Sequence, residues 1–137
     1  MKTSFVPVLF AAALVWAAAP IVVTAGEDHD HDHAGHSHHE PRHGGLLEEA
    51  GGLDYELVVK PGLTRLYVSG HDEPVSLKGG KATITFLRGG QTSKIVLLPV
   101  GSDYFEAKGD MPSGAGVRAV ALVLIKGKSA SVRFAYK

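Results

Sequence analysis

Apolar and polar positions alternate in short segments along the C-terminal two thirds of the chain, and turn residues separate these segments. Residues 54–60 and 64–70 lie on either side of Pro61 and Gly62. Proline presets the first central φ of a turn and glycine supplies a positive φ at the second, so this spacing predicts two strands joined by a tight turn. Further strands are predicted at residues 81–87, 93–100, 103–109, 117–125 and 130–136.

The pattern predicts an all-β domain, a small antiparallel β-sandwich or barrel of about seven strands. Residues 117–125 are apolar on both faces apart from Arg118, so hydrophobicity alone would also allow a buried helix. Their β-branched content, their short length and the flanking Gly116 and Gly127 favour a central strand. The roughly ninety residues of this domain can bury a modest core, so we expect the fold to be stable without metal.

The N-terminus has the pattern of an export signal. Lys2 precedes an uncharged apolar run over residues 5–19, and a proline and small residues follow. This predicts a secretory signal peptide at residues 1–25, cleaved after Ala25; the alternative is an uncleaved membrane anchor. The chain has no cysteine, and a small exported protein without disulfides indicates a bacterial periplasm. We therefore expect a periplasmic protein with no membrane partner after cleavage.

Residues 26–43 form a separate segment in front of the β domain at residues 44–137. This arm holds seven of the eight histidines and carries five acidic residues against one arginine, whereas the domain has nine acidic and twelve basic residues. The polar composition predicts a disordered arm. The basic residues of the domain are scattered along the sequence and an acidic arm would repel phosphate, so no nucleic-acid partner is expected.

The histidine spacing in the arm indicates transition-metal binding. His29, His31 and His33 alternate with aspartates, so in an extended chain their imidazoles project to one side and can converge on one ion. Neutral imidazole suits a divalent transition metal such as zinc, copper(II), nickel or cobalt, while the lack of cysteine disfavours copper(I). The predicted metal ligands are His29, His31, His33, His36, His38, His39, His43 and His71. The alternative is a solvated leader whose histidines bind no ion.

His71 is the single histidine of the domain sequence, and Asp72 and Glu73 follow it at once. A single histidine in a loop is more commonly a surface residue than a ligand. His43, however, leads into the first predicted strand and His71 ends the second. If the hairpin between them folds back, both histidines meet at one edge of the sheet, and a shared site is one of two open outcomes.

Several motifs occur in an order that resembles a known family: "HGG" at residues 43–45, "DYELVVKPG" at 54–62, "LYVSGHDEPV" at 66–75, "KATITFL" at 81–87 and "VRF" at 132–134. This order resembles small histidine-rich periplasmic proteins associated with heavy-metal efflux systems of the resistance-nodulation-division type, and a segment of some of their periplasmic adaptor subunits. The resemblance covers residues 43–136. It implies a metal-handling role beside an efflux pump and gives His43 and His71 a place in the family pattern. The methionine-rich segments of dedicated copper(I) carriers are missing from this chain.

The motifs of common enzymes are absent from the sequence, which has no nucleophile elbow, phosphate-binding loop or metalloprotease helix, so no catalytic activity is expected. We predict a periplasmic binding protein that sequesters or delivers a divalent transition-metal ion, with an efflux-pump periplasmic adaptor as a candidate partner. Two alternatives stay open. One is a non-catalytic interaction module of an efflux assembly that binds by strand addition, and the other is a pH-responsive envelope protein.

Overall fold

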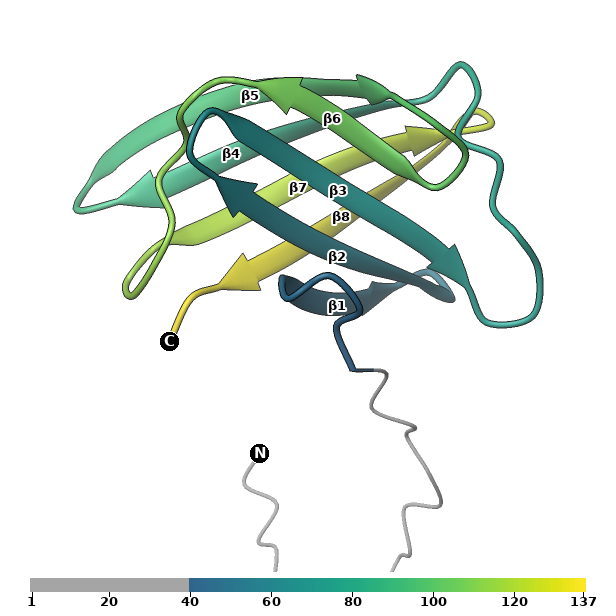
Figure 1. Ribbon diagram of the computed structural model, residues 1–137, viewed down its shortest axis with the longest axis horizontal. Coiled ribbons are helices and arrows are strands. Elements are labelled where there is room, and N and C mark those ends of the chain that lie inside the picture. Colours follow the sequence, from purple (N-terminus) through teal and green to yellow (C-terminus); the bar gives the residue numbers. More distant parts are fainter. Residues whose placement is uncertain (1–39) are drawn as a thin grey trace, which may run out of the picture. The chain divides into compact units, whose positions relative to one another are not determined.

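Eight antiparallel strands follow one another along residues 40–137, the part of the chain that the computed structural model describes (Figure 1). They are β1 (Leu46–Ala50), β2 (Leu53–Lys60), β3 (Leu63–Gly70), β4 (Lys81–Arg88), β5 (Gln91–Pro99), β6 (Tyr104–Lys108), β7 (Arg118–Ile125) and β8 (Lys128–Ala135). The predicted signal peptide at residues 1–25 and residues 26–39 of the predicted disordered arm (26–43) lie outside the described residues, whereas residues 40–43 of that arm are described and the amides of Arg42 and His43 donate to Glu56. No helix within residues 40–137 has the length and apolar character needed to cross a membrane.

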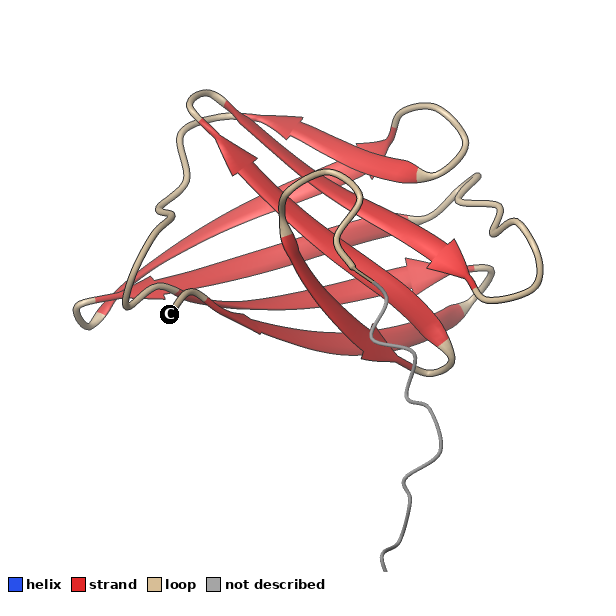
Figure 2. Cartoon of the chain, turned by 60° about the horizontal axis from the view of Figure 1, so that its bottom comes forward, coloured by secondary structure: helices blue, strands red, loops and turns tan. Residues whose placement is uncertain are grey.

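The strands form a nearly closed barrel in the order β1-β2-β3-β6-β5-β4-β7-β8, which confirms the predicted all-β class. One half contains β1, β2, β3 and β6 and the other contains β5, β4, β7 and β8, and the strands of the two halves cross at an angle (Figures 1 and 2). β5 and β6 join the halves through two residue pairs, Leu98 with Glu106 and Pro99 with Phe105. β1 and β8 stand at the two ends of the order and lie beside each other.

The seven predicted strands are all present, and β1 is an eighth strand that the pattern did not reveal. Its sequence "LLEEA" lacks a two-residue alternation of apolar and polar positions. The signal that was present is the turn after it, where Gly51 and Gly52 have φ values of 60° and 75°. Two adjacent glycines with positive φ suit a two-residue hairpin loop. The predicted turn at Pro61 and Gly62 is confirmed, with a φ of 72° at Gly62.

The hydrophobic core lies between the two halves of the barrel. Buried and exposed residues alternate along β4 and β7, so that one face of each strand packs inward. The largest fully buried side chains are Tyr55, Phe86, Phe105, Phe134, Leu57, Leu66, Leu77, Ile84, Leu97, Val117, Val123 and Val132. Each large aliphatic or aromatic side chain buried in this way contributes about 1.5–3 kcal/mol. Thr64 is also fully buried, and its hydroxyl has no hydrogen-bond partner among the described residues.

β7 is central, as predicted, although only one of its two apolar faces is buried. It lies between β4 and β8, as a central strand should, but its burial alternates along its whole length. The inward residues are Ala119, Ala121, Val123 and Ile125, and the apolar residues exposed on the outside are Val120, Leu122 and Leu124. The apolar run of β7 is therefore continuous because one face of the strand packs in the core and the other forms an aliphatic outer surface.

Candidate metal centre

β2 places two acidic side chains on the outer face of the barrel. Asp54 and Glu56 alternate with Tyr55 and Leu57, which belong to the core. Successive strand residues point to opposite faces, so the two carboxylates share one face and lie about 7 Å apart along the strand. Both acidic residues are nevertheless buried. Segments that cross this face must therefore cover them and supply their polar contacts.

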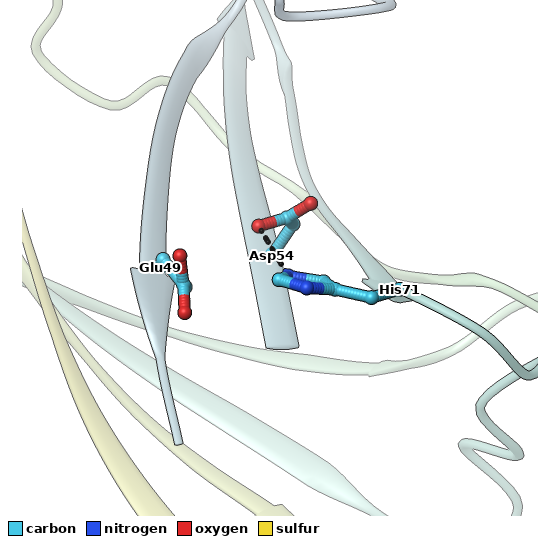
Figure 3. Close-up of side chains that lie close together, drawn as sticks. All are labelled: Glu49, Asp54 and His71. Atoms are coloured by element: carbon cyan, nitrogen blue, oxygen red, sulfur yellow. Dashed lines mark ion pairs between the residues drawn. The ribbon is translucent and has the colours of Figure 1, made fainter. Parts of the chain in front are cut away.

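Glu49, Asp54 and His71 bring their ligand atoms together at one end of this face (Figure 3). Glu49 of β1 pairs with Asp54 of β2, and His71 comes directly after Gly70, the last residue of β3. One oxygen of each carboxylate and one imidazole nitrogen all lie within 4.8 Å of one another. His71 Nε2 lies 3.4 Å from Asp54 Oδ1. The cluster therefore combines one nitrogen and two oxygen donors from β1, β2 and the residue that follows β3.

A tight reversal of the chain after β3 sets the position of His71. A Cβ atom on Gly70 would lie 2.5 Å from the carbonyl oxygen of Glu73, which no larger residue tolerates without a shift of the backbone. Glu49 and His71 are exposed, while Asp54 is buried. The cluster thus has a fixed carboxylate at its base and two donors that open to solvent.

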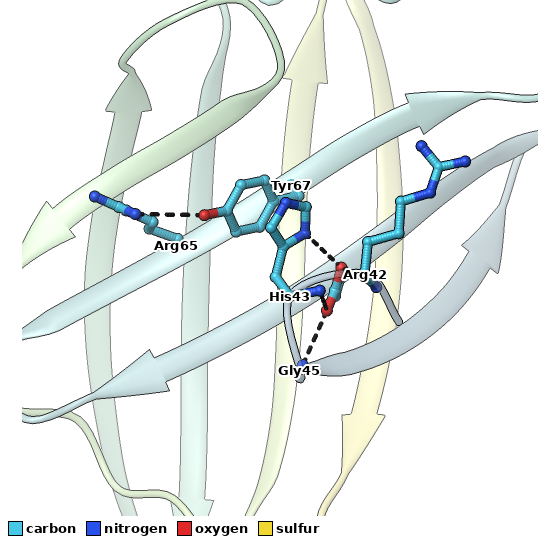
Figure 4. A network of polar contacts seen from close by, with 6 residues as sticks. Arg42, His43, Gly45, Arg65 and Tyr67 are labelled. Carbon is cyan, nitrogen blue, oxygen red and sulfur yellow. Dashed lines mark hydrogen bonds and ion pairs between the residues drawn. The ribbon is translucent and has the colours of Figure 1, made fainter. Parts of the chain in front are cut away.

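Glu56 fastens His43 to the same face of the barrel (Figure 4). The Nδ1 atom of His43 lies 2.7 Å from Glu56 Oε2, and the His43 amide donates to Oε1 at 2.8 Å. The amides of Arg42 and Gly45 donate to the same carboxylate at 3.1 and 2.9 Å. The imidazole also stacks on Tyr67, with ring centroids 3.6 Å apart and planes 5° apart. Residues 42–45 are thereby held across β2 and β3.

The two glycines of the "HGG" motif have different physical roles in this arrangement. Gly44 has a φ of 75°, a conformation in which glycine is favoured. Gly45 passes directly against β2, and a Cβ atom there would lie 2.3 Å from the carbonyl oxygen of Leu57. The turn and the close approach together bring the backbone amides on both sides of Gly44 to the Glu56 carboxylate.

The surroundings of Glu56 lower its pKa. Burial alone would raise the pKa by disfavouring the charged form. Hydrogen bonds from the Gly45 amide, the His43 ring and the His43 amide, together with the charge of His43, favour the carboxylate and outweigh the effect of burial. Glu56 therefore acts as a charged anchor for the segment before β1.

Tyr67, which carries the His43 ring, is itself supported by β6 and by its own strand. Arg65 donates from its Nε to Glu106 Oε2 at 2.7 Å and from Nη1 to the Tyr67 hydroxyl at 3.4 Å. These hydrogen bonds raise the pKa of Arg65, the bond to Glu106 contributing most, so that its charge is permanent. The Arg65 guanidinium also lies 5.0 Å from the centre of the Tyr104 ring. The platform beneath His43 is therefore a connected polar and aromatic layer.

His43 and His71 lie on the same face of the barrel but contact different carboxylates. His43 contacts Glu56, whereas His71 contacts Asp54, two residues away on β2. A pocket of about 80 Å³ is lined by His43, Asp54 and Glu56 together with neighbouring residues. The three-residue cluster contains His71 without His43. The structure thus brings the two histidines to adjacent positions, each with its own acidic partner.

The structure describes two of the eight predicted ligands, His43 and His71. The other six, His29, His31, His33, His36, His38 and His39, lie outside the described residues. Glu49, Asp54 and Glu56 are not among the residues predicted from the sequence. A signal for two of them was present, because Asp54 and Glu56 interrupt an apolar strand at alternate positions and so mark one polar face. Glu49 could not be placed without β1.

The fold and this cluster define a small all-β protein with a candidate site of one histidine and two carboxylates. Comparison of the chain with protein-family models, with curated proteins and with solved structures finds no match. The resemblance to proteins of heavy-metal efflux systems therefore stays a prediction.

Proposed function

We propose that this chain binds a divalent transition-metal ion, namely zinc, cobalt, nickel or copper(II), with Glu49, Asp54 and His71 as ligands in the β domain. The histidines of residues 26–43 collect the same ion in this proposal. The observation that supports it is the approach of one imidazole nitrogen and two carboxylate oxygens to within 4.8 Å at a solvent-open strand end. Catalysis is no part of the proposal.

The spacing of the donor atoms suits such an ion. Ligand atoms bound at about 2.1 Å in a tetrahedron lie about 3.4 Å from one another. His71 Nε2 and Asp54 Oδ1 are 3.4 Å apart, which is longer than a usual N–H···O hydrogen bond. Glu49 is exposed, so its side chain can rotate to complete the third contact.

The chemistry of the donors also supports this choice of ions. Two carboxylates and a neutral imidazole match the charge of a divalent cation. Oxygen and imidazole ligands suit zinc, cobalt, nickel and copper(II), whereas copper(I) prefers sulfur, and the chain has no cysteine. Three protein ligands leave a coordination position for a further donor. Such a site can therefore both accept an ion and pass it on.

The arm can supply that further donor because its base is fastened beside the cluster. His43 is held by Glu56, which neighbours Asp54 on the same face of β2. An extended chain gains about 3.3 Å per residue, so the four residues from His43 back to His39 span up to about 13 Å. That reach exceeds the separation of about 7 Å between alternate residues of a strand. A tethered histidine therefore acts on the cluster at a high effective concentration.

The cellular setting in this proposal is the periplasm beside a heavy-metal efflux system. The signal-like leader at residues 1–25 and the resemblance over residues 43–136 support it. A second candidate function is an interaction module of an efflux assembly. β1 and β8 are the ends of the sheet order and lie beside each other without pairing among the described residues, and an added strand from a partner can pair at this open seam.

The test is calorimetric titration with zinc, cobalt, nickel and copper(II) salts. Two chains are compared, one that begins at residue 26 and one that begins at residue 40 and keeps the described body. We expect the shorter chain to bind one ion and the longer chain to bind more ions. Asp54→Asn, Glu49→Gln and His71→Ala should each weaken the single site of the shorter chain by about ten-fold or more.

Matched controls are the neighbouring exposed acids, in the variants Glu48→Gln and Asp72→Asn, which should leave affinity within about two-fold. Because imidazole must be neutral to bind a metal, affinity should fall between about pH 7 and pH 5. A shorter chain that takes up no ion, or a Glu48→Gln variant as weak as Glu49→Gln, would exclude the cluster as a metal site. If the longer chain still binds ions in that case, metal binding belongs to the arm alone.

A further inference from the structure

Exposed aliphatic side chains gather on the outer face of the half-barrel made of β5, β4, β7 and β8, strands that lie side by side in Figure 1. They are Leu87, Val96, Leu98, Val100, Val120, Leu122 and Leu124. The strand register aligns them in rows, because Thr83 of β4 pairs with Val96 on one side and with Leu122 on the other. Two strand spacings of about 4.8 Å place such neighbours about 10 Å apart. Soluble monomers rarely expose apolar side chains in contiguous patches of this kind.

The charged side chains in the same half of the barrel are all positive. Residues 81–102 and 111–137 contain no aspartate or glutamate. Their lysines and arginines are Lys81, Arg88, Lys94, Arg118, Lys126, Lys128, Arg133 and Lys137. All nine acidic residues of the β domain lie elsewhere, in or next to β1, β2, β3 and β6. These basic residues are scattered along the sequence. The pairing of β5, β4, β7 and β8 brings exposed Lys81, Lys94, Arg118 and Arg133 into one sheet, while Lys126 and Lys128 line a pocket with the turn between β1 and β2.

Cations and aliphatic side chains alternate on this basic aliphatic face, which consists of the exposed residues of β4, β5, β7 and β8. Arg133 of β8 pairs with Val120 of β7, and Lys81 of β4 pairs with Leu124 of β7. All four of these residues are exposed. A lysine in this position can lay its aliphatic stem along the apolar surface and extend its ammonium group beyond it. The face therefore combines apolar contact with positive charge over its whole width.

The uniform sign of the charge selects among possible occupants. A second copy docked through the same face would oppose cation to cation. The acidic arm matches the charge, but residues 26–40 contain a single apolar residue, Ala34, and would leave the leucines uncovered. A protein partner would match this face only through an acidic patch that also presents apolar side chains, because complementary surfaces pair positive with negative potential. A sheet of anionic headgroups above hydrocarbon attracts cations, repels every carboxylate and accepts aliphatic side chains.

We propose that the basic aliphatic face rests on the surface of an anionic phospholipid bilayer, with its leucines in the headgroup region and its lysines and arginines against the phosphates. From the cleavable leader alone, no membrane partner is expected after cleavage; the strand register that brings these residues together is not visible in the sequence. The proposal concerns adsorption to a surface and is independent of metal binding. It also orients the molecule: Asp54 and His71 belong to the other half of the barrel and would face water, while Glu48 and Glu49 line one pocket with Arg133 where β1 meets β8 and so mark the border of the face.

The test is co-sedimentation of the protein with vesicles, using a chain that begins at residue 26, so that the apolar N-terminal run cannot insert on its own. Vesicles of phosphatidylglycerol mixed with phosphatidylethanolamine are compared with vesicles of phosphatidylcholine. We expect binding to the anionic vesicles that weakens as salt rises. The double variant Lys94→Gln/Arg133→Gln should weaken this binding by about 25-fold, since each cation near an anionic surface contributes about five-fold. Leu98→Asn/Leu122→Asn, at the two most exposed aliphatic positions, should weaken it by roughly ten-fold.

The matched control is Lys60→Gln/Lys108→Gln, which removes the same charge from exposed positions on β2 and β6. It should change binding by less than about three-fold. Thermal unfolding of each variant establishes that the surface changes leave the fold intact. Equal losses in the control and in Lys94→Gln/Arg133→Gln, or no binding to anionic vesicles at low salt, would overturn the proposal. So would a dimer in sedimentation velocity that Leu98→Asn/Leu122→Asn dissolves, because a second copy would then cover the face.

Discussion

The imidazole ring of His43 lies flat against the phenol ring of Tyr67, with centroids 3.6 Å apart and planes 5° apart. Stacking at this distance places the carbon-bound protons of His43 in the shielding region of the Tyr67 ring. We therefore expect these protons to resonate upfield of their positions in an unfolded chain. Tyr67→Leu should move them back in proton NMR spectra, while Tyr104→Leu, which alters a tilted neighbour of Tyr67, should move them little. An unshifted His43 in the unmodified protein would contradict the stacking.

Glu56→Gln should destabilise the protein at neutral pH by about 1–3 kcal/mol. In the unmodified protein three backbone amides donate to the Glu56 carboxylate, and in the variant they would face a neutral side-chain amide that accepts more weakly. The folded state lowers the pKa of Glu56, so its charge contributes stability above the usual glutamate value of about 4.3. That contribution is lost as the pH falls through the lower, folded pKa. Urea unfolding at a series of pH values should show the gap between the two proteins closing in acid. The exposed variant Glu48→Gln should show no such gap.

Gly45→Ala should destabilise the body more than Gly44→Ala does. At Gly44 a side chain has open space and meets only the strain of a positive φ, about 1 kcal/mol. At Gly45 a Cβ atom would lie 2.3 Å from the Leu57 carbonyl oxygen, so residues 42–45 must move away from β2 and release Glu56. Chemical unfolding of both variants measures the difference. If the order were reversed, the close passage of Gly45 against β2 would be wrong.

The fold could largely be predicted from the sequence, because apolar and polar residues alternate along most strands. Residues 81–87 alternate between core and surface, and they form β4 almost as predicted. β1 was missed because Leu46 and Leu47 are adjacent and Glu48 and Glu49 are adjacent, which hides a period of two. Strand order was also inaccessible, since alternation does not say that β6 returns to pair with β3.

The candidate site was accessible in part. His71 stands out as the single histidine of residues 44–137 and His43 as the last histidine before the first predicted strand, and the hairpin between them explains why they share a face. Their acidic partners, Glu56 and Asp54, both lie on β2, and these contacts follow from the pairing of β2 with β1 and β3, which the sequence does not state. The basic aliphatic face was inaccessible for the same reason, because Lys81 and Leu124 are far apart in the chain and paired in the sheet.

Thr64→Val should stabilise the protein by about 1 kcal/mol. The Thr64 hydroxyl is fully buried and has no hydrogen-bond partner among the described residues, so it bears the cost of lost hydration without compensation. Valine has the same branched shape and removes that cost. Denaturant unfolding at neutral pH checks this prediction, and a less stable valine variant would show that the hydroxyl has a partner in solution.

The position of β6 has a consequence for how the chain folds. β6 pairs with β3, although β4 and β5 lie between these two strands in the sequence. It also pairs with β5, through two residue pairs. The hairpins β2–β3, β4–β5 and β7–β8 close over short loops and form early, whereas β6 must close a long loop whose entropic cost precedes any gain from pairing. We expect β6 to be the last strand to dock and the first to open. Amide hydrogens of Tyr104–Lys108 should then exchange with solvent before those of Lys81–Arg88, and a chain caught before that step would present the edge of β3 to its neighbours.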